Sequence, residues 1–207
     1  MPLQNRVTPD GDIIATEARG TLMGNRGVLH DADRRIIRRS RNRMWLICLL
    51  EFRERRRSVM TPGSYTELFF LDEAVALAAG HRPCAECRRD RYRAFLDASR
   101  VGAGRPVAGA KDLDALLAAS RRAPRSSALA AELPDGVFVD LGGRDGDRDL
   151  RLMWGGATHR WTPAGYVDRA PVSAAAGEVA VVTPALTVAA LRHGYRVQVH
   201  PTAHRSG

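Results

Sequence analysis

The sequence predicts an α+β fold, in which a small mixed unit of strands and helices precedes a β-rich unit that ends in a short helix. Short apolar runs between glycine and proline turns predict strands along most of the chain. Two helix patterns begin at capping residues and end at glycine. A stretch rich in Gly, Pro, Ser and Ala over residues 99–130 separates the two parts. These observations divide the chain into residues 1–100, a linker or mobile insertion at 101–130, and residues 131–207.

The strands of the first unit are predicted from apolar runs and turn signals. Residues 12–16 and 27–30 flank the glycine-rich turn GNRG, which occupies residues 24–27. Residues 44–52 form a strongly apolar run that stops at arginines, and residues 65–71 form another run after a Pro-Gly turn.

Two helices follow these strands. Asp72 is a suitable N-cap for a helix over residues 73–79, and Gly80 suits the left-handed position that ends a helix. A second helix starts at Arg88, where apolar residues recur at helical spacing. The linker that comes next contains one short amphipathic stretch, at residues 113–117.

The last part of the chain predicts a small β-rich unit. Candidate strands lie at residues 136–141, 150–154, 158–162 and 179–182. Thr183 and Pro184 then form a helix start, with proline at the first helical position. The helix covers residues 186–191, and Gly194 ends it.

Size and composition exclude several classes of protein. A chain of 207 residues can bury a core without a disulfide or a metal. The longest apolar run, at residues 44–50, is far shorter than the roughly 20 residues that cross a bilayer. No secretory signal is recognisable at the start of the sequence, and the three cysteines cannot all pair. We therefore expect a cytoplasmic protein with reduced cysteines and no membrane partner.

The charge predicts an acidic partner. The net charge is +9, and all but one of the 32 basic residues are arginine. Ten of them lie within residues 33–57, namely Arg34, Arg35, Arg38, Arg39, Arg41, Arg43, Arg53, Arg55, Arg56 and Arg57. Guanidinium groups bind phosphate in a bidentate manner, so this arginine-rich cluster is a candidate nucleic-acid surface. The alternative is a solvated, salt-bridged face in an arginine-biased proteome.

The strongest chemical motif is Pro83-Cys84-Ala85-Glu86-Cys87. A Cys-x-x-Cys turn places two thiolates on one side of a bend, as a tetrahedral zinc ion requires, and neighbouring arginines favour the ionised form. A redox pair is one alternative, although redox motifs usually open a helix directly after a strand. Two unconnected buried thiols are the other.

Residues 69–91, FFLDEAVALAAGHRPCAECRRDR, resemble the second half of the Ada-type zinc module. In that family a strand, a short alanine-rich helix and an Arg-Pro-Cys-x-x-Cys-Arg segment complete a four-thiolate zinc site in a DNA-binding repair protein. The resemblance implies a zinc cofactor, a DNA partner and a link to DNA repair. His81 stands where the family has Phe or Tyr, which implies a packing role.

The first cysteine pair of that family is absent from this sequence, and the loss removes the family's methyl acceptor. The one upstream cysteine is Cys48, in the apolar run, and it becomes the predicted third zinc ligand. His30 is the predicted fourth ligand, and His200 or His204 would compete only if the two units touch. Cys48 could instead be a core residue, and His30 a strand-end histidine bonded to a carbonyl.

Taken together, these features predict a zinc-containing, arginine-rich protein that binds nucleic acid, with DNA expected and damaged or modified DNA as a candidate target. The first alternative is a metal-supported nuclease or a base- or damage-processing enzyme, with GNRG, His30 and Glu67 near the reacting group. The second is a protein-interaction module with a basic face. The sequence shows no complete set of catalytic residues.

Overall fold

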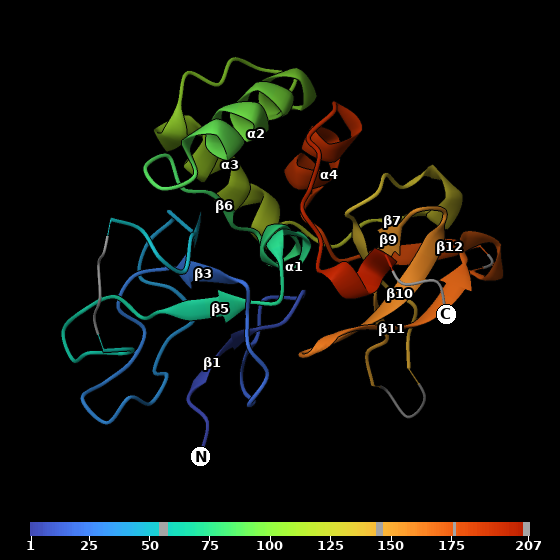
Figure 1. Ribbon diagram of the computed structural model, residues 1–207. Coiled ribbons are helices and arrows are strands. Elements are labelled where there is room, and N and C mark those ends of the chain that lie inside the picture. Colours follow the sequence, from blue (N-terminus) through green and yellow to red (C-terminus); the bar gives the residue numbers. More distant parts are fainter. Residues whose placement is uncertain (54–57, 144–146, 176, 205–207) are drawn as a thin grey trace.

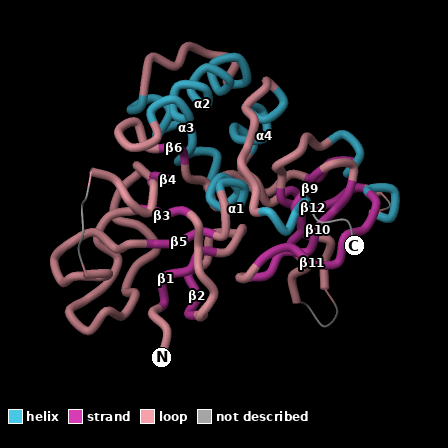
Figure 2. Tube along the Cα trace, in the orientation of Figure 1, coloured by secondary structure: helices cyan, strands magenta, loops and turns pink. Residues whose placement is uncertain are grey.

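The protein has the α+β fold that the sequence predicts. The computed structural model describes residues 1–53, 58–143, 147–175 and 177–204. A mixed sheet forms in the N-terminal part, an all-antiparallel sheet forms in the C-terminal part, and the short helix α4 (Ala185–Arg192) follows the second sheet. Figures 1 and 2 show the two sheets on either side of helix α1 (Glu73–Ala78). Among the described residues, no helix is long and apolar enough to cross a bilayer.

The N-terminal sheet has six short strands in the order β2-β1-β5-β3-β4-β6. In chain order these are β1 (Gln4–Val7), β2 (Ile13–Ala15), β3 (Leu22–Asn25), β4 (Leu46–Cys48), β5 (Leu68–Phe70) and β6 (Arg82–Pro83). Two of the pairings, β1 with β5 and β4 with β6, are parallel. The sheet is therefore mixed. Its parallel edge pair ends at two cysteines, Cys48 in β4 and Cys84 directly after β6.

Helix α1 begins and ends where the sequence predicts. The Asp72 carboxylate accepts a hydrogen bond from the Val75 N–H at 2.9 Å and caps the helix. Gly80 has a φ of +87°, in the left-handed region that glycine favours after a helix. All six residues of α1 are buried, so this helix belongs to the core rather than to the surface.

The segment predicted as a linker is largely helical. Helix α2 (Arg89–Gly102) ends inside it and helix α3 (Ala110–Arg122) lies wholly within it. Leu113 and Leu117 of α3 are buried in the same hydrophobic cluster as residues of both sheets. Helix α3 also contacts α2 and α4. Most of the described segment is thus packed structure that joins the two units.

The C-terminal sheet has the strand order β11-β10-β9-β8-β12-β7, and every neighbouring pair is antiparallel. The strands are β7 (Ser127–Leu129), β8 (Phe138–Asp140), β9 (Leu150–Trp154), β10 (Ala157–Thr162), β11 (Gly165–Pro171) and β12 (Glu178–Val181). In the described part of this unit, short turns of 3₁₀-helix accompany them at η1 (Ala130–Glu132), η3 (Val172–Ala174) and η4 (Pro201–His204). The sequence places the N-cap of α4 at Thr183, whereas the structure has Pro184 at this position and the helix begins at Ala185. The Thr183 hydroxyl accepts a hydrogen bond from the Phe138 N–H at 2.8 Å and does not cap the helix.

Two carboxylates at the start of α1 connect the units. Asp72 accepts hydrogen bonds from the Tyr166 hydroxyl at 2.7 Å and from the His200 N–H at 2.8 Å. Its neighbour Glu73 accepts hydrogen bonds from the Tyr195 hydroxyl at 2.6 Å and from the Gln198 N–H at 2.9 Å. Residues 195–200 are thereby held against the N-terminal end of α1.

The main differences from the predicted strands lie around GNRG and after it. Gly24 and Asn25 belong to β3, so GNRG is not a hairpin turn between two strands. In place of a strand at 27–30, His30 forms only an isolated bridge with Ile36. The apolar run 44–52 contributes three residues to β4, because Leu49 and Leu50 are exposed beyond the sheet.

Candidate metal centre

The parallel pairing of β4 and β6 brings two cysteines together from distant parts of the sequence. Ile47 lies opposite Pro83 in this pairing, and Cys48 and Cys84 are the next residues along. The Cys84 N–H donates to the Ile47 carbonyl at 2.9 Å and continues the ladder by one hydrogen bond. The turn after Cys84 then returns Cys87 to the same place, directly before α2.

The three sulfur atoms of Cys48, Cys84 and Cys87 all lie within 4.8 Å of one another. Tetrahedral zinc with bonds of about 2.3 Å to sulfur needs sulfurs about 3.8 Å apart. Cys84 is buried and the other two cysteines are half-buried. Within the described ranges, this is the one group of three or more His, Cys, Asp or Glu side chains close enough together to hold a metal ion. The geometry and donor type fit zinc.

The electrostatics of the group also favour a cation. All three cysteines are free thiols. Hydrogen bonds from the Cys48 and Cys87 thiols lower the pKa of Cys84 to about 2, whereas the contact with Cys84 raises the pKa of Cys48. Within the group, the Cys84 sulfur is thus the one that most favours the thiolate form. A bound cation would allow all three sulfurs to ionise, because its charge offsets their mutual repulsion.

A pocket of about 310 Å³ opens beside the three cysteines and is lined mainly by apolar side chains such as Leu46 and Phe69. Glu67 lines it too and is buried. One of its carboxylate oxygens accepts the Met60 N–H at 2.8 Å, while the other, Oε1, has no hydrogen-bond partner among the described residues. A buried carboxylate oxygen without a partner is costly, so its presence beside a candidate metal site calls for a functional explanation.

His30, the predicted fourth ligand, lies outside the cysteine group. Its Nδ1 is 2.6 Å from the Thr66 hydroxyl and its Nε2 is 3.2 Å from the Thr61 carbonyl oxygen. Both ring nitrogens are thus occupied by neighbours in the fold. The contact with the Thr61 carbonyl agrees with the alternative given above, in which His30 is bonded to a backbone carbonyl.

The other histidines considered are also separate from the cysteines. His81 is buried, with its ring 4.7 Å from that of Phe70, as the packing role predicts. The Nδ1 of His200 lies 2.9 Å from the Thr202 hydroxyl, and His204 packs its ring edge-on against Trp154. Among the described residues, the three cysteines alone thus form a group that could hold a metal ion such as zinc.

The arginine-rich cluster lies on the surface in an irregular segment rather than along a helix. Its exposed members are Arg34, Arg35, Arg38, Arg39, Arg41, Arg43 and Arg53. The other three predicted residues, Arg55, Arg56 and Arg57, lie outside the described residues. Arg39 pairs with Asp12, and weaker ion pairs link Arg35 to Asp33 and Arg53 to Glu86, at 3.8 and 3.9 Å.

Sequence reasoning missed a second group of basic side chains that centres on Trp45. The guanidinium carbons of Arg26 and Arg121 lie 3.9 and 4.2 Å from the centroid of the Trp45 ring. Arg26 is the arginine of GNRG and is fully buried. No local signal marks its burial, because its partners His81 and Gly11 come from other segments.

Comparison with known proteins adds no family assignment. No protein-family model matches the chain, and no curated protein or solved structure is significantly similar to it.

Proposed function

We propose that the protein is a zinc protein that binds nucleic acid, with DNA as the expected partner and damaged or modified DNA as a candidate target. The observation that carries the proposal is the convergence of Cys48, Cys84 and Cys87. Three thiols from two distant segments meet without forming a disulfide, which is the arrangement that a bound zinc ion stabilises.

The zinc in this proposal has a structural role. It would fix the end of β4 to the turn that precedes α2, since Cys48 belongs to the first and the other two cysteines to the second. The strand, helix, glycine and Cys-x-x-Cys order around α1 is also that of the Ada-type segment, and this resemblance supports zinc in a DNA-binding setting.

Surface charge supports the nucleic-acid part of the proposal. Seven arginines of the cluster are exposed, and the chain carries a net charge of +9. A broad surface hollow of about 670 Å³ has Arg41 and Arg43 on one wall and Arg121 and Arg122, at the end of α3, on the other. Neutralising backbone phosphates releases counterions, which is the main source of affinity in such contacts.

Zinc binding is tested by metal analysis of the purified protein together with cobalt substitution. We expect about one zinc per chain, and cobalt in its place should give the intense charge-transfer absorption of thiolate ligands. Cys48→Ser should weaken this absorption and lower zinc affinity. His30→Gln is the matched control and should leave both unchanged. A metal-free protein with an unaltered melting curve would refute the zinc site.

Nucleic-acid binding is tested by titrating labelled duplex DNA at several salt concentrations. Four to six phosphate contacts predict a slope of about −4 to −5 in a plot of log K against log salt. Replacing Arg38 and Arg39 together by alanine should flatten this slope by about two and weaken all sequences alike. Arg192→Ala, outside the cluster, should leave the slope unchanged. A slope near zero would favour a basic face that meets an acidic protein.

A second candidate function, a metal-supported nuclease or a base-processing enzyme, is favoured by Glu67. Glu67, whose Oε1 has no hydrogen-bond partner among the described residues, and the three cysteines line the same pocket. A zinc ion with three protein ligands keeps a fourth position for water or substrate, and a nearby carboxylate is the kind of group that accepts a proton from such a water.

The two functions are separated by product analysis. Labelled single- and double-stranded DNA incubated with the zinc-loaded protein should remain intact under the structural role and should be cleaved or altered under the catalytic one. Glu67→Gln would abolish the reaction while leaving zinc content and DNA affinity unchanged. Loss of zinc in that variant would instead make Glu67 part of the metal site.

A further inference from the structure

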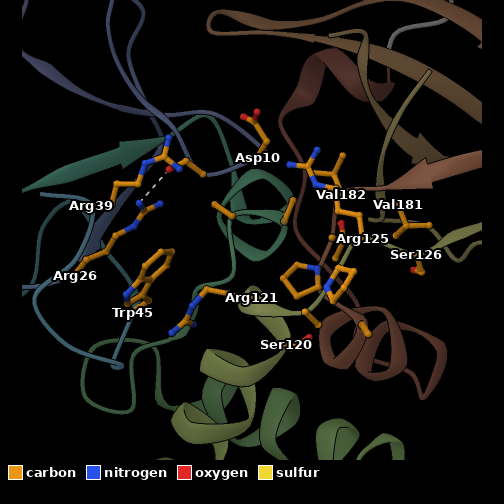
Figure 3. A pocket seen from close by; sticks show the side chains of 18 residues that line it. Asp10, Arg26, Arg39, Trp45, Ser120, Arg121, Arg125, Ser126, Val181 and Val182 are labelled. Atoms are coloured by element: carbon orange, nitrogen blue, oxygen red, sulfur yellow. Dashed lines mark hydrogen bonds between the residues drawn. The ribbon is translucent and has the colours of Figure 1, made fainter. Parts of the chain in front are cut away.

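A second pocket, of about 230 Å³, lies between the N-terminal sheet and the start of α4 (Figure 3). The side chains of Arg26, Arg39, Arg121 and Arg125 line it, and Asp10 is the one acidic residue among the lining residues. The Asp10 carboxylate is already paired with Arg148 at 2.9 Å. The pocket is therefore rich in positive charge that its own lining does not neutralise.

Arg26 is the least compensated of these side chains. It is fully buried, and its Nε and Nη1 donate to His81 Nε2 and the Gly11 carbonyl, at 3.1 and 3.0 Å. Both acceptors are uncharged groups. Its Nη2 has no hydrogen-bond partner, and no carboxylate lies within ion-pair distance of Arg26 among the described residues. The nearby Asp12 carboxylate is paired with Arg39, so Arg26 has no carboxylate in direct contact within the described ranges, and such a buried cation favours an anion that completes the site.

Arg121 adds a second cation next to the first. Its two terminal nitrogens donate to the backbone carbonyls of Gly80 and Arg43, at 2.7 and 2.9 Å. In Figure 3 the Trp45 ring lies between the side chains of Arg26 and Arg121. Burial, and then the charges of Arg121 and Arg39, lower the pKa of Arg26 to about 9, so the group is still charged at neutral pH.

We propose that this pocket binds a phosphate group, with Arg26 as its innermost ligand and Arg125 at its rim, while Arg121 adds positive charge from beyond the Trp45 ring. A phosphate carries more negative charge and more acceptor oxygens than a carboxylate, so it suits a pocket lined by several guanidinium groups. Trp45 already contacts two guanidinium groups, so it holds the arginines in place and does not serve as a stacking surface for a base.

Where the phosphate comes from rests on the proposed function. Arg39 belongs both to this pocket and to the arginine-rich cluster, and Arg121 lines both this pocket and the surface hollow beside Arg41 and Arg43. The pocket is thus continuous with the surface proposed to bind nucleic acid. Under that proposal, the ligand is a phosphate of the bound strand, and a free phosphate compound is the other source of the same chemistry.

The first test uses inorganic phosphate and the full chain at constant ionic strength. At a phosphate concentration one hundred times Kd, the melting temperature should rise by about 5 to 10 °C. Binding should also change the fluorescence of Trp45, and Trp45→Phe should remove that change. No shift in melting temperature and a Kd weaker than about 10 mM would overturn the proposal.

Two variants assign the site. Arg26→Gln should weaken phosphate binding about tenfold or more, the loss of one hydrogen bond to a charged group. Should that variant fail to fold, Arg125→Ala at the exposed rim should still weaken binding about two- to fivefold. Arg105→Ala is the control, because Arg105 is exposed and lies outside the pocket. Equal phosphate affinity in wild type, Arg26→Gln and Arg125→Ala would refute the assignment.

A competition experiment then identifies the source of the phosphate. Saturating inorganic phosphate should weaken binding of a short labelled oligonucleotide by wild type but not by Arg26→Gln. Phosphate binding without such competition would assign the pocket to a free phosphate compound. A protein that binds phosphate but no oligonucleotide would support the phosphate pocket and overturn the proposed function. A protein that binds oligonucleotide but not phosphate would support the proposed function and overturn the phosphate pocket.

Discussion

Replacing Glu73 by glutamine tests how the C-terminal segment is held. The Glu73 carboxylate is fully buried and forms ion pairs with Arg91 and, at 3.0 Å, with Arg88. It also accepts hydrogen bonds from the Tyr195 hydroxyl and the Gln198 N–H. Glutamine keeps the shape and one acceptor oxygen but removes the negative charge. Arg88, whose side chain is only 3% exposed, would then be left as a buried cation.

Removing one partner of a buried ion pair lowers the free energy of unfolding by about 3–5 kcal/mol. Glutamine still accepts one hydrogen bond, so we expect a loss of about 3 kcal/mol, at the lower end of this range. For a chain of this size the melting temperature should fall by about 6 to 12 °C. Thermal melting and guanidinium denaturation measure the effect, and the denaturation midpoint should fall without a change in slope.

Asp97→Asn is the matched control, because Asp97 pairs with Arg100 on the exposed face of α2. Its side chain is 68% exposed, so the variant should lose no more than about 1 kcal/mol. If Glu73→Gln melts within about 2 °C of wild type, the carboxylate contributes less than about 1 kcal/mol, and the reasoning about this connection is wrong.

Three further predictions concern packing, pH and metal. Gly24→Ala should destabilise the protein by about 1–3 kcal/mol in a thermal melt, because a Cβ there would lie 2.3 Å from the buried Phe70 ring; an unchanged melt would show that the ring can move. Burial raises the pKa of Asp72 to about 6, so its contribution to stability is present below about pH 4 and is lost as the pH rises through 6. The free energy of unfolding of Asp72→Asn should therefore rise relative to wild type by about 2 kcal/mol between pH 4 and 7, and parallel pH profiles would contradict this. Chelation should lower the melting temperature of wild type but not that of Cys48→Ser, and equal responses would place the metal elsewhere.

Features that depend on a few neighbouring residues could be predicted from the sequence. Asp72 and Gly80 bound helix α1 as expected, because capping and the left-handed turn depend on the local chain. The α+β class was also predictable, because apolar runs and turn signals repeat along the chain. Cys48 was selected as a partner for Cys84 and Cys87 by elimination, and the structure does bring the three together.

Features that depend on pairing between distant segments could not be predicted. The parallel register of β4 and β6 decides which residue meets Cys84, and neither strand is long enough to show a pattern. The burial of Arg26 depends on Gly11 and His81, which come from separate segments. The position of His30 outside the cysteine group could not be predicted for the same reason, because its neighbours Thr66 and Thr61 come from a distant segment.

The link between α1 and residues 195–200 has a consequence for biosynthesis. The hydrogen-bond partners that residues 195–200 supply to Glu73 and Asp72 lie 122 to 128 residues further along the chain. At about 5–20 residues per second, a ribosome needs about 6 to 25 seconds to make that stretch. Until those residues are made, the two carboxylates have only partners that lie nearer in the chain, such as the Val75 N–H for Asp72 and the Arg88 guanidinium for Glu73. The start of α1 therefore lacks part of its final hydrogen bonding while residues 195–200 are still to be made.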